Sequence, residues 1–251
     1  MLTNAPIIVS NFTLAARSNF HLFGPAHLMI LISVPVLGAA LAKGCTRSLR
    51  TARRIRYSVA LFLSANELVW YAYRLHYEGF RFPHALPLNL CDLTLWLTVV
   101  AILSLNQWAF EMAYFAGVGG NGMALLTPDL WAPFPSYPTV YFFVAHGVAV
   151  AALLMLLWGR IAAPKPGCLR RVFILLNAYA ILIGIFNAVF RTNYMYLCTK
   201  PAGASLLDYL GPWPVYIASG EVVALVIFWL LWLPFRVRAP GGQARSGSPA
   251  C

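Results

Sequence analysis

Seven long apolar stretches take up most of this 251-residue chain and leave only short connections between them. They cover residues 27–42, 55–74, 86–105, 108–126, 138–159, 170–190 and 212–233. A helix needs about 20 apolar residues to cross the hydrocarbon core of a bilayer. The pattern therefore predicts an all-α polytopic membrane protein with seven transmembrane helices. The fourth stretch is the weakest, because it is rich in glycine and contains Glu111 and Asn121.

The composition excludes other classes of protein. The chain is 61% hydrophobic and 10% charged, against roughly 45–50% and about 25% in soluble domains. An ordinary soluble enzyme, a disordered chain and a fibrous repeat are excluded. We expect residues 1–26 to form an outer N-terminal segment without a signal peptide, 27–233 the transmembrane domain, and 234–251 a disordered cytoplasmic tail.

The basic residues predict the orientation in the membrane. The first and fifth connections and the tail carry 13 of the 18 Lys and Arg residues, and the opposite side carries five. Cytoplasmic loops are enriched in Lys and Arg, so we expect the N-terminus outside and the C-terminus in the cytoplasm. The net charge of +11 thus indicates topology, and we expect no nucleic-acid partner.

Polar side chains at one depth suggest a site in the outer half of the bundle. At about 1.5 Å per helical residue, they fall in the half of the membrane that adjoins the outer connections. These residues are Asn66, Glu67, Asn89, Cys91, Asp92, Asn121, His146, Asn187, Ser219 and Glu221. An outward-opening polar cavity is one interpretation, and hydrogen bonding between helices is the other. Glu111 lies near the cytoplasmic end and is expected to serve folding or the interface.

Cys91 and His146 are the thiol and the imidazole that lie deep within the stretches. A Cys–His pair can carry out nucleophilic acyl transfer, with the imidazole accepting the thiol proton. Asp92 or Glu67 would orient the imidazole, and Asn121 or Asn187 would stabilise an oxyanion. Two other interpretations stay open: Cys91 as a packing residue, and a disulfide between Cys91 and Cys198. We expect no metal or other cofactor, because no CxxC and no i, i+4 histidine pair occurs.

The outer connections are rich in proline and aromatic residues, as at 77–83, 128–135 and 191–213. They are expected to form a structured lid or simple interfacial anchors. Seven-helix photoreceptors need a lysine in the last span, but Lys43, Lys165 and Lys200 all lie in connections. The chain is therefore not a rhodopsin. It also lacks the Asn-Pro-x-x-Tyr and Asp-Arg-Tyr motifs of G-protein-coupled receptors.

Five separated blocks resemble a known family. They are Leu86-Pro-Leu-Asn-Leu-Cys-Asp-Leu93, Gly119-Gly-Asn-Gly122 with Thr127-Pro-Asp-Leu130, His146-Gly147, Asn193-Tyr-Met-Tyr-Leu197 with Lys200-Pro201, and Gly211-Pro-Trp-Pro214. In this order they resemble the bacterial YwaF-like integral membrane proteins, which are similar to the eukaryotic transmembrane protein 164 family. The eukaryotic members are regarded as fatty-acyl transferases acting on ether phospholipids through an intramembrane Cys and His. The resemblance would assign those roles to Cys91 and His146.

The leading functional prediction is a lipid acyltransferase or lipid hydrolase in a bacterial plasma membrane, with a membrane lipid as substrate. Arg191 and Lys200 are expected to hold its headgroup phosphate. The rival prediction is a transporter or solute-binding protein that uses Glu67, Asp92 and Glu221, with helices broken near 117–120 and 212–214. A third interpretation is a structural or assembly partner without chemistry. The oligomeric state is not predicted.

Overall fold

The computed structural model describes residues 20–130, 132–201 and 205–236, and the described part is helical without strands. The expected tail, and most of the expected N-terminal segment, lie outside these residues. The longer helices are α2 (Pro25–Cys45), α3 (Leu49–Glu78), α4 (Leu90–Ser104), α7 (Tyr137–Trp158), α8 (Cys168–Phe190) and α9 (Val215–Arg236). The shorter ones are α5 (Gln107–Ala113), η1 (Tyr114–Asn121), α6 (Gly122–Leu126), η2 (Tyr194–Tyr196) and η3 (Leu206–Leu210).

Each predicted apolar stretch coincides with a helix or a continuous helical run, so the all-α prediction is confirmed. Four helices in the described residues, α2, α7, α8 and α9, are both long and apolar enough to cross a membrane. The other three stretches fall short for separate reasons. Helix α3 begins with a cluster of arginines, α4 has only 15 residues, and the fourth stretch is divided into α5, η1 and α6.

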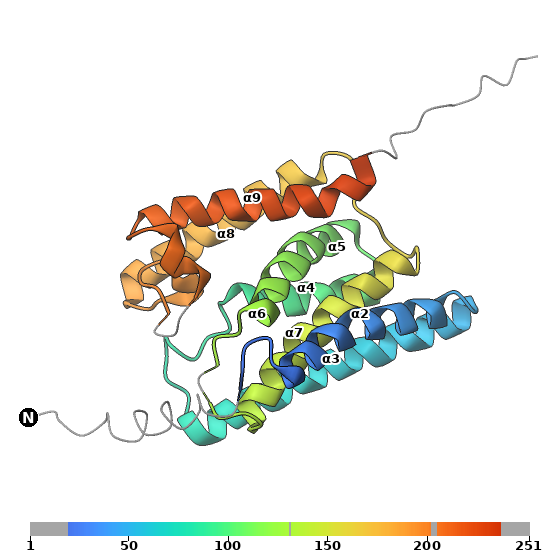
Figure 1. Cartoon of the computed structure of the whole chain (residues 1–251), viewed down its shortest axis with the longest axis horizontal. Helices are drawn as coiled ribbons and strands as arrows, with labels where there is room; N and C mark the ends of the chain where they lie inside the picture. The colour runs from blue at the N-terminus through green and yellow to red at the C-terminus, as the bar shows by residue number, and fades with distance from the viewer. Residues whose placement is uncertain (1–19, 131, 202–204, 237–251) are drawn as a thin grey trace, which may run out of the picture.

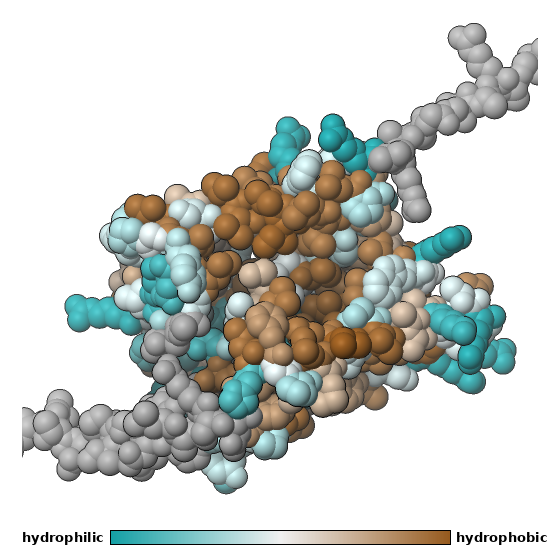
Figure 2. All heavy atoms as spheres, in the orientation of Figure 1, coloured by the Kyte–Doolittle hydropathy of each residue, from teal (hydrophilic) through white to brown (hydrophobic). Residues whose placement is uncertain are grey.

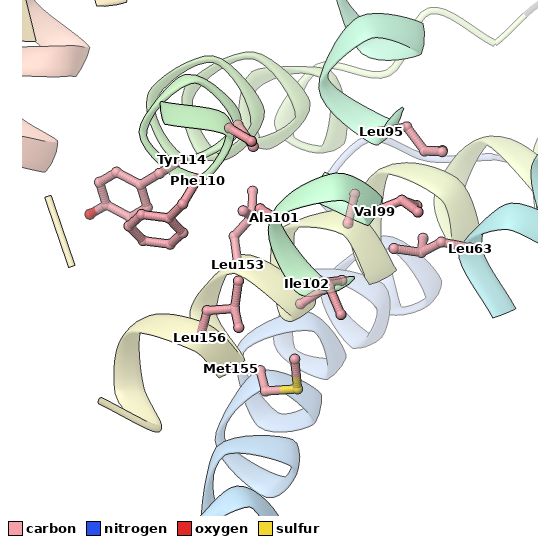
Figure 3. Close-up of a cluster of buried hydrophobic side chains, with 14 of the residues drawn as sticks. Leu63, Leu95, Val99, Ala101, Ile102, Phe110, Tyr114, Leu153, Met155 and Leu156 are labelled. Atoms are coloured by element: carbon pink, nitrogen blue, oxygen red, sulfur yellow. The ribbon is translucent and has the colours of Figure 1, made fainter. Parts of the chain in front are cut away.

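Helix α7 lies at the centre of the fold (Figure 1), with α2 packed along it and α3, α4 and η1 also in contact. The core forms where α3, α4, α5 and α7 meet. Figure 3 shows Leu63, Val99, Ile102, Phe110 and Leu153 pointing into this cluster. Helices α8 and α9 lie to one side and contact the rest mainly through α5 and η1. Their outward faces are apolar (Figure 2), as expected for surfaces in contact with lipid.

The fourth stretch is continuous where the rival prediction expected a break. Residues 114–121 form a π-helix that joins α5 to α6 without interruption. A side chain at Gly117 would come within 2.9 Å of Leu153 on α7, so glycine allows the two helices to approach closely. Proline 214 likewise precedes α9, which begins at Val215, and does not break it. Both broken-helix predictions are therefore wrong. π-Helical segments within α-helices are frequently found at functional sites.

Helix α4 begins later than the predicted 86–105 stretch, at Leu90. The backbone N–H of Asn89 donates to the Asp92 carboxylate at 2.9 Å, which caps the first turn. At the opposite end Leu105 adopts a left-handed conformation with φ 55° and ends the helix. These caps place Cys91 in the first turn of α4.

Glu111 has the folding role that its position suggested. Its buried carboxylate pairs with Arg171 of α8 and accepts hydrogen bonds from the Gln107 side chain at 2.8 Å and the Lys165 backbone N–H at 3.1 Å. The Arg171 guanidinium also lies 4.5 Å from the centre of the Trp108 ring. The network joins α5, α8 and the connection between α7 and α8.

Candidate functional site

Cys91 is an unbonded, half-buried thiol at the second residue of α4. We call the end of the helices that carries residues 79–89, 127–136 and 191–214 the outer end. The Tyr179 hydroxyl of α8 donates to the Leu88 carbonyl at 2.9 Å and holds the segment that leads into α4. Backbone N–H groups in the first turn of a helix have no intrahelical acceptor and can stabilise a nearby negative charge. The thiol therefore has a position suited to a nucleophile.

Two carboxylates lie close enough to Cys91 to act on it electrostatically, Asp92 next to it and Glu67 on α3. Glu67 is fully buried, and its Oε2 accepts a 2.6 Å hydrogen bond from the Tyr141 hydroxyl on α7. Its other oxygen, Oε1, has no well-formed hydrogen bond among the described residues. Tyr71, one helical turn along α3, lies within electrostatic range of Glu67 and accepts a 3.2 Å hydrogen bond from the Trp96 indole. Glu67 and Asp92 thus lie within electrostatic range of Cys91.

His146 makes a 2.7 Å hydrogen bond from Nδ1 to the Phe142 carbonyl one turn earlier on α7. Because a carbonyl only accepts, Nδ1 carries the proton and Nε2 of the neutral ring is a proton acceptor. No hydrogen bond joins His146 to Cys91 in the part of the chain that the structure describes.

Both residues nevertheless lie on helix faces turned toward η1. His146 precedes Leu153 by seven residues and so shares its face, and Leu153 packs against Gly117 of η1. Cys91 precedes Thr94 by three residues, and the Thr94 hydroxyl donates to Asn121 Oδ1 of η1 at 3.3 Å. Asn121 is buried, and its Nδ2 has no hydrogen-bond partner within the described residues. This amide remains available to a bound group.

Two other members of the expected polar layer, Asn187 and Glu221, serve other purposes. Asn187 accepts from Thr192 and from the Tyr194 backbone N–H and donates to the Tyr194 carbonyl, so its side chain shapes the chain after α8. An oxyanion role for Asn187 is therefore not supported. Glu221 of α9 accepts from Asn177 of α8 at 3.1 Å and ties these two helices together. Here the interhelical hydrogen-bonding interpretation is correct.

The outer connections are bonded to one another, as the lid interpretation expected. The Tyr194 hydroxyl donates to the Pro83 carbonyl at 2.7 Å, the Met195 N–H donates to Asn89 Oδ1 at 3.2 Å, and the Tyr196 hydroxyl donates to Asp129 at 3.0 Å. Partial burial and then the Asp129 carboxylate raise the pKa of Tyr196, so its hydroxyl stays a donor. Met195 and Tyr196 have φ of 57° and 53°, a conformation that non-glycine residues seldom adopt.

Two adjoining hollows open at this end of the molecule. The larger, of about 450 Å³, is lined by His84, Asn187, Ala188, Arg191, Thr192, Asn193, Cys198 and Thr199. The smaller, of about 230 Å³, shares three of these residues and reaches Asn89, two residues from Cys91. Arg191 has no ion pair among the described residues. Lys200, by contrast, lies with Nζ 5.5 Å from the centre of the Tyr216 ring and does not line the hollow.

The disulfide alternative is wrong, because Cys91 and Cys198 are both unbonded. Nor do three or more His, Cys, Asp or Glu residues gather as a metal site would require in residues 20–130, 132–201 and 205–236.

Sequence reasoning missed Tyr141, Tyr71 and His84. Tyr141 had a usable signal, because it lies in the outer half of another span, as Glu67 does, and a buried carboxylate needs a donor. His84 lines both hollows, but it sits in an irregular connection where no periodicity predicts its direction.

Removing the Tyr141 hydroxyl tests how Glu67 is held. Tyr141→Phe leaves both carboxylate oxygens without a hydrogen bond, and an unsatisfied buried polar group is costly. We expect a loss of about 1–2 kcal/mol in unfolding free energy, measured by thermal unfolding in detergent. Tyr209→Phe is the control, since this ring is 88% exposed. Equal stability of the two variants would show that Tyr141 does not hold Glu67.

Apolar helices around a buried polar group define the class of this protein, a helical integral membrane protein. The chain belongs to the TMEM164 family, whose model matches residues 22–232. Comparisons with curated proteins and with solved structures find no match.

Proposed function

We propose that this protein is a thiol-dependent lipid acyltransferase or lipid hydrolase with Cys91 as the nucleophile. The observation that carries the proposal is the free thiol in the first turn of α4, on a helix face that meets η1. The hollows at the outer end support it, since they reach Asn89 just before the thiol.

His146 would take the thiol proton. Its Nδ1 is held by the Phe142 carbonyl, which leaves Nε2 as the acceptor. The face of α7 that carries His146 and the face of α4 that carries Cys91 both meet η1. The mechanism requires the ring and the sulfur to meet when a lipid is bound, and catalytic contacts are often loose before substrate binds.

The proposed reaction has two steps, formation of a thioester and its breakdown. The Cys91 sulfur attacks the ester carbonyl carbon of a lipid, its proton passes to His146, and the C–O bond breaks as the leaving alcohol takes that proton. An acceptor hydroxyl then attacks the thioester, or water does in hydrolysis, and the thiol is restored. The Asn121 amide nitrogen is the side-chain donor for the oxyanion in both steps.

Arg191 and His84 line the larger hollow and supply the groups that would hold a headgroup phosphate. Lys200 would contribute only if it left the Tyr216 ring. The acyl chains would lie among the apolar helices, and the substrate would come from the outer leaflet.

The test is to incubate the purified full chain with a phospholipid that carries an alkyne-tagged acyl chain. We expect a mass increase of one acyl group that neutral hydroxylamine removes, since thioesters are cleaved under those conditions. Absence of labelling with ester-linked donors of several headgroups would contradict the proposal.

A second candidate is proton or cation transport, and the unpartnered Oε1 of the buried Glu67 is the observation that favours it. The acids have separate partners, however, with Asp92 capping α4 and Glu221 bonded to Asn177. Ion flux into proteoliposomes that depends on Glu67 would favour transport over acyl transfer.

We further propose seven spans with the N-terminus outside, in a bacterial plasma membrane. The 13-to-5 distribution of basic residues supports the orientation. A reporter fused after residue 245 is expected in the cytoplasm and one inserted within 130–136 outside, as measured by compartment-specific activity. Both reporters on one side would contradict the seven-span topology.

A further inference from the structure

A strongly basic surface lies at the end of the bundle opposite Cys91, where α2 ends and α3 begins. Lys43, Arg47, Arg50, Arg53 and Arg54 are all exposed there. No acidic residue precedes Glu67 in the whole sequence. The two ion pairs among the described residues involve Arg74 and Arg171, so these five cations have none. Figure 2 shows the hydrophilic cluster over this end of the molecule.

The fold holds this surface in place. Arg56 points inward, and its guanidinium donates to the carbonyls of Ile102 at 2.7 Å and Leu103 at 3.0 Å, at the end of α4. A side chain at Gly159 would come within 3.6 Å of Cys45, so the exposed Arg160 belongs to the same end. Arg56 therefore stabilises the fold, whereas the side chains of the exposed cations make no hydrogen bond or ion pair among the described residues.

The arginines lie at the end of α3 where positive charge is unfavourable. The positive end of the α3 dipole carries Arg50, Arg53 and Arg54 in its first two turns, and no acid lies in the first turn. Cations at a helix N-terminus are unfavourable, whereas anions there are stabilising. An external anion would remove this cost and would also neutralise the mutual repulsion of the arginines.

An apolar side chain identifies what kind of anion fits. Leu49, the first residue of α3, is 93% exposed and lies between Arg47 and Arg50 in the sequence. A basic segment with a projecting leucine suits the membrane interface, where the apolar group inserts beside the acyl chains and the cations meet phosphates. A soluble anion would leave the Leu49 side chain exposed to water.

We propose that the surface formed by Lys43, Arg47, Leu49, Arg50, Arg53, Arg54 and Arg160 binds anionic phospholipid headgroups of the leaflet that faces this end. The site is separate from the proposed acyl-transfer site, because α4 lies between them with Cys91 at one end and the Arg56 contacts at the other. The orientation of the protein in the membrane decides only which leaflet supplies these lipids.

The test is a titration of short-chain phosphatidylglycerol into the purified full chain in neutral detergent, followed by thermal unfolding. Each basic residue near an anionic surface contributes about fivefold in affinity. We therefore expect Arg50→Gln/Arg53→Gln/Arg54→Gln to weaken phosphatidylglycerol binding roughly a hundredfold. The matched control, Arg81→Gln at the outer end, should bind as the wild type does.

Three measurements on the wild-type protein test the proposal even if the triple variant does not fold. Phosphatidylglycerol should raise the Tm, and the rise should shrink at high salt. Phosphatidylcholine and soluble glycerol phosphate should give little rise. Equal stabilisation by phosphatidylcholine, or full stabilisation by glycerol phosphate, would overturn the proposal, and so would a triple variant that binds phosphatidylglycerol normally.

Discussion

Cys91→Ser is expected to reduce acyl labelling by at least about a hundredfold, because a serine hydroxyl is a far weaker nucleophile than a thiol at neutral pH. The change is nearly isosteric at a half-buried position, so the protein should fold normally. Labelling is measured as hydroxylamine-sensitive mass on the intact chain.

His146→Gln should reduce labelling by about 10²-fold or more, since the ring is the proposed proton acceptor.

Cys198→Ser is the matched control. Cys198 is also unbonded and lines the larger hollow, but it is exposed and lies in a connection. We expect this variant to keep full labelling. Loss of labelling in Cys198→Ser with retention in Cys91→Ser would move the nucleophile to the outer loop and contradict the proposed mechanism.

Gly38→Val should be the most damaging single change to the packing of the bundle. A side chain at Gly38 would come within 2.9 Å of Leu154 Cβ and 3.2 Å of the Ala151 carbonyl oxygen, both on α7. The carbonyl belongs to the helix backbone and cannot turn aside. We expect α2 to be forced away from α7, with a loss of about 3 kcal/mol, measured by thermal unfolding in detergent.

Gly220→Ala is the control for this prediction. Gly220 lies within α9, and a side chain there would meet no atom within 4 Å. Alanine also has the higher helix propensity, so stability should stay the same or rise. A Gly38→Val protein as stable as Gly220→Ala would show that α2 and α7 do not depend on this close approach.

The helices of this protein were predictable because a membrane span is a local property of the chain. Each apolar stretch ended near its predicted boundary, and the position of Glu111 near one end of its stretch indicated a role in folding or at the interface, in keeping with its pairing with Arg171. Local signals were misread where glycine allows two helices to pack closely. The glycines at 117–120 suggested a break, yet η1 is continuous and lies close against α7.

The candidate site depended on contacts between distant residues. Depth along a span placed Glu67, Asn121 and Asn187 in one layer, but depth does not say which way a side chain points. Glu67 bonds to Tyr141, 74 residues away, while Asn187 turns to its own following connection.

The sequence alone determined the class of the protein and the approximate extent of its helices, because hydrophobicity acts along the chain. Only the tertiary structure decided which polar groups meet, since rotation about each helix axis and the course of the outer connections follow from packing between helices. That is why Glu67 of α3 lies within electrostatic range of Cys91, whereas Glu221 bonds to Asn177 of α8.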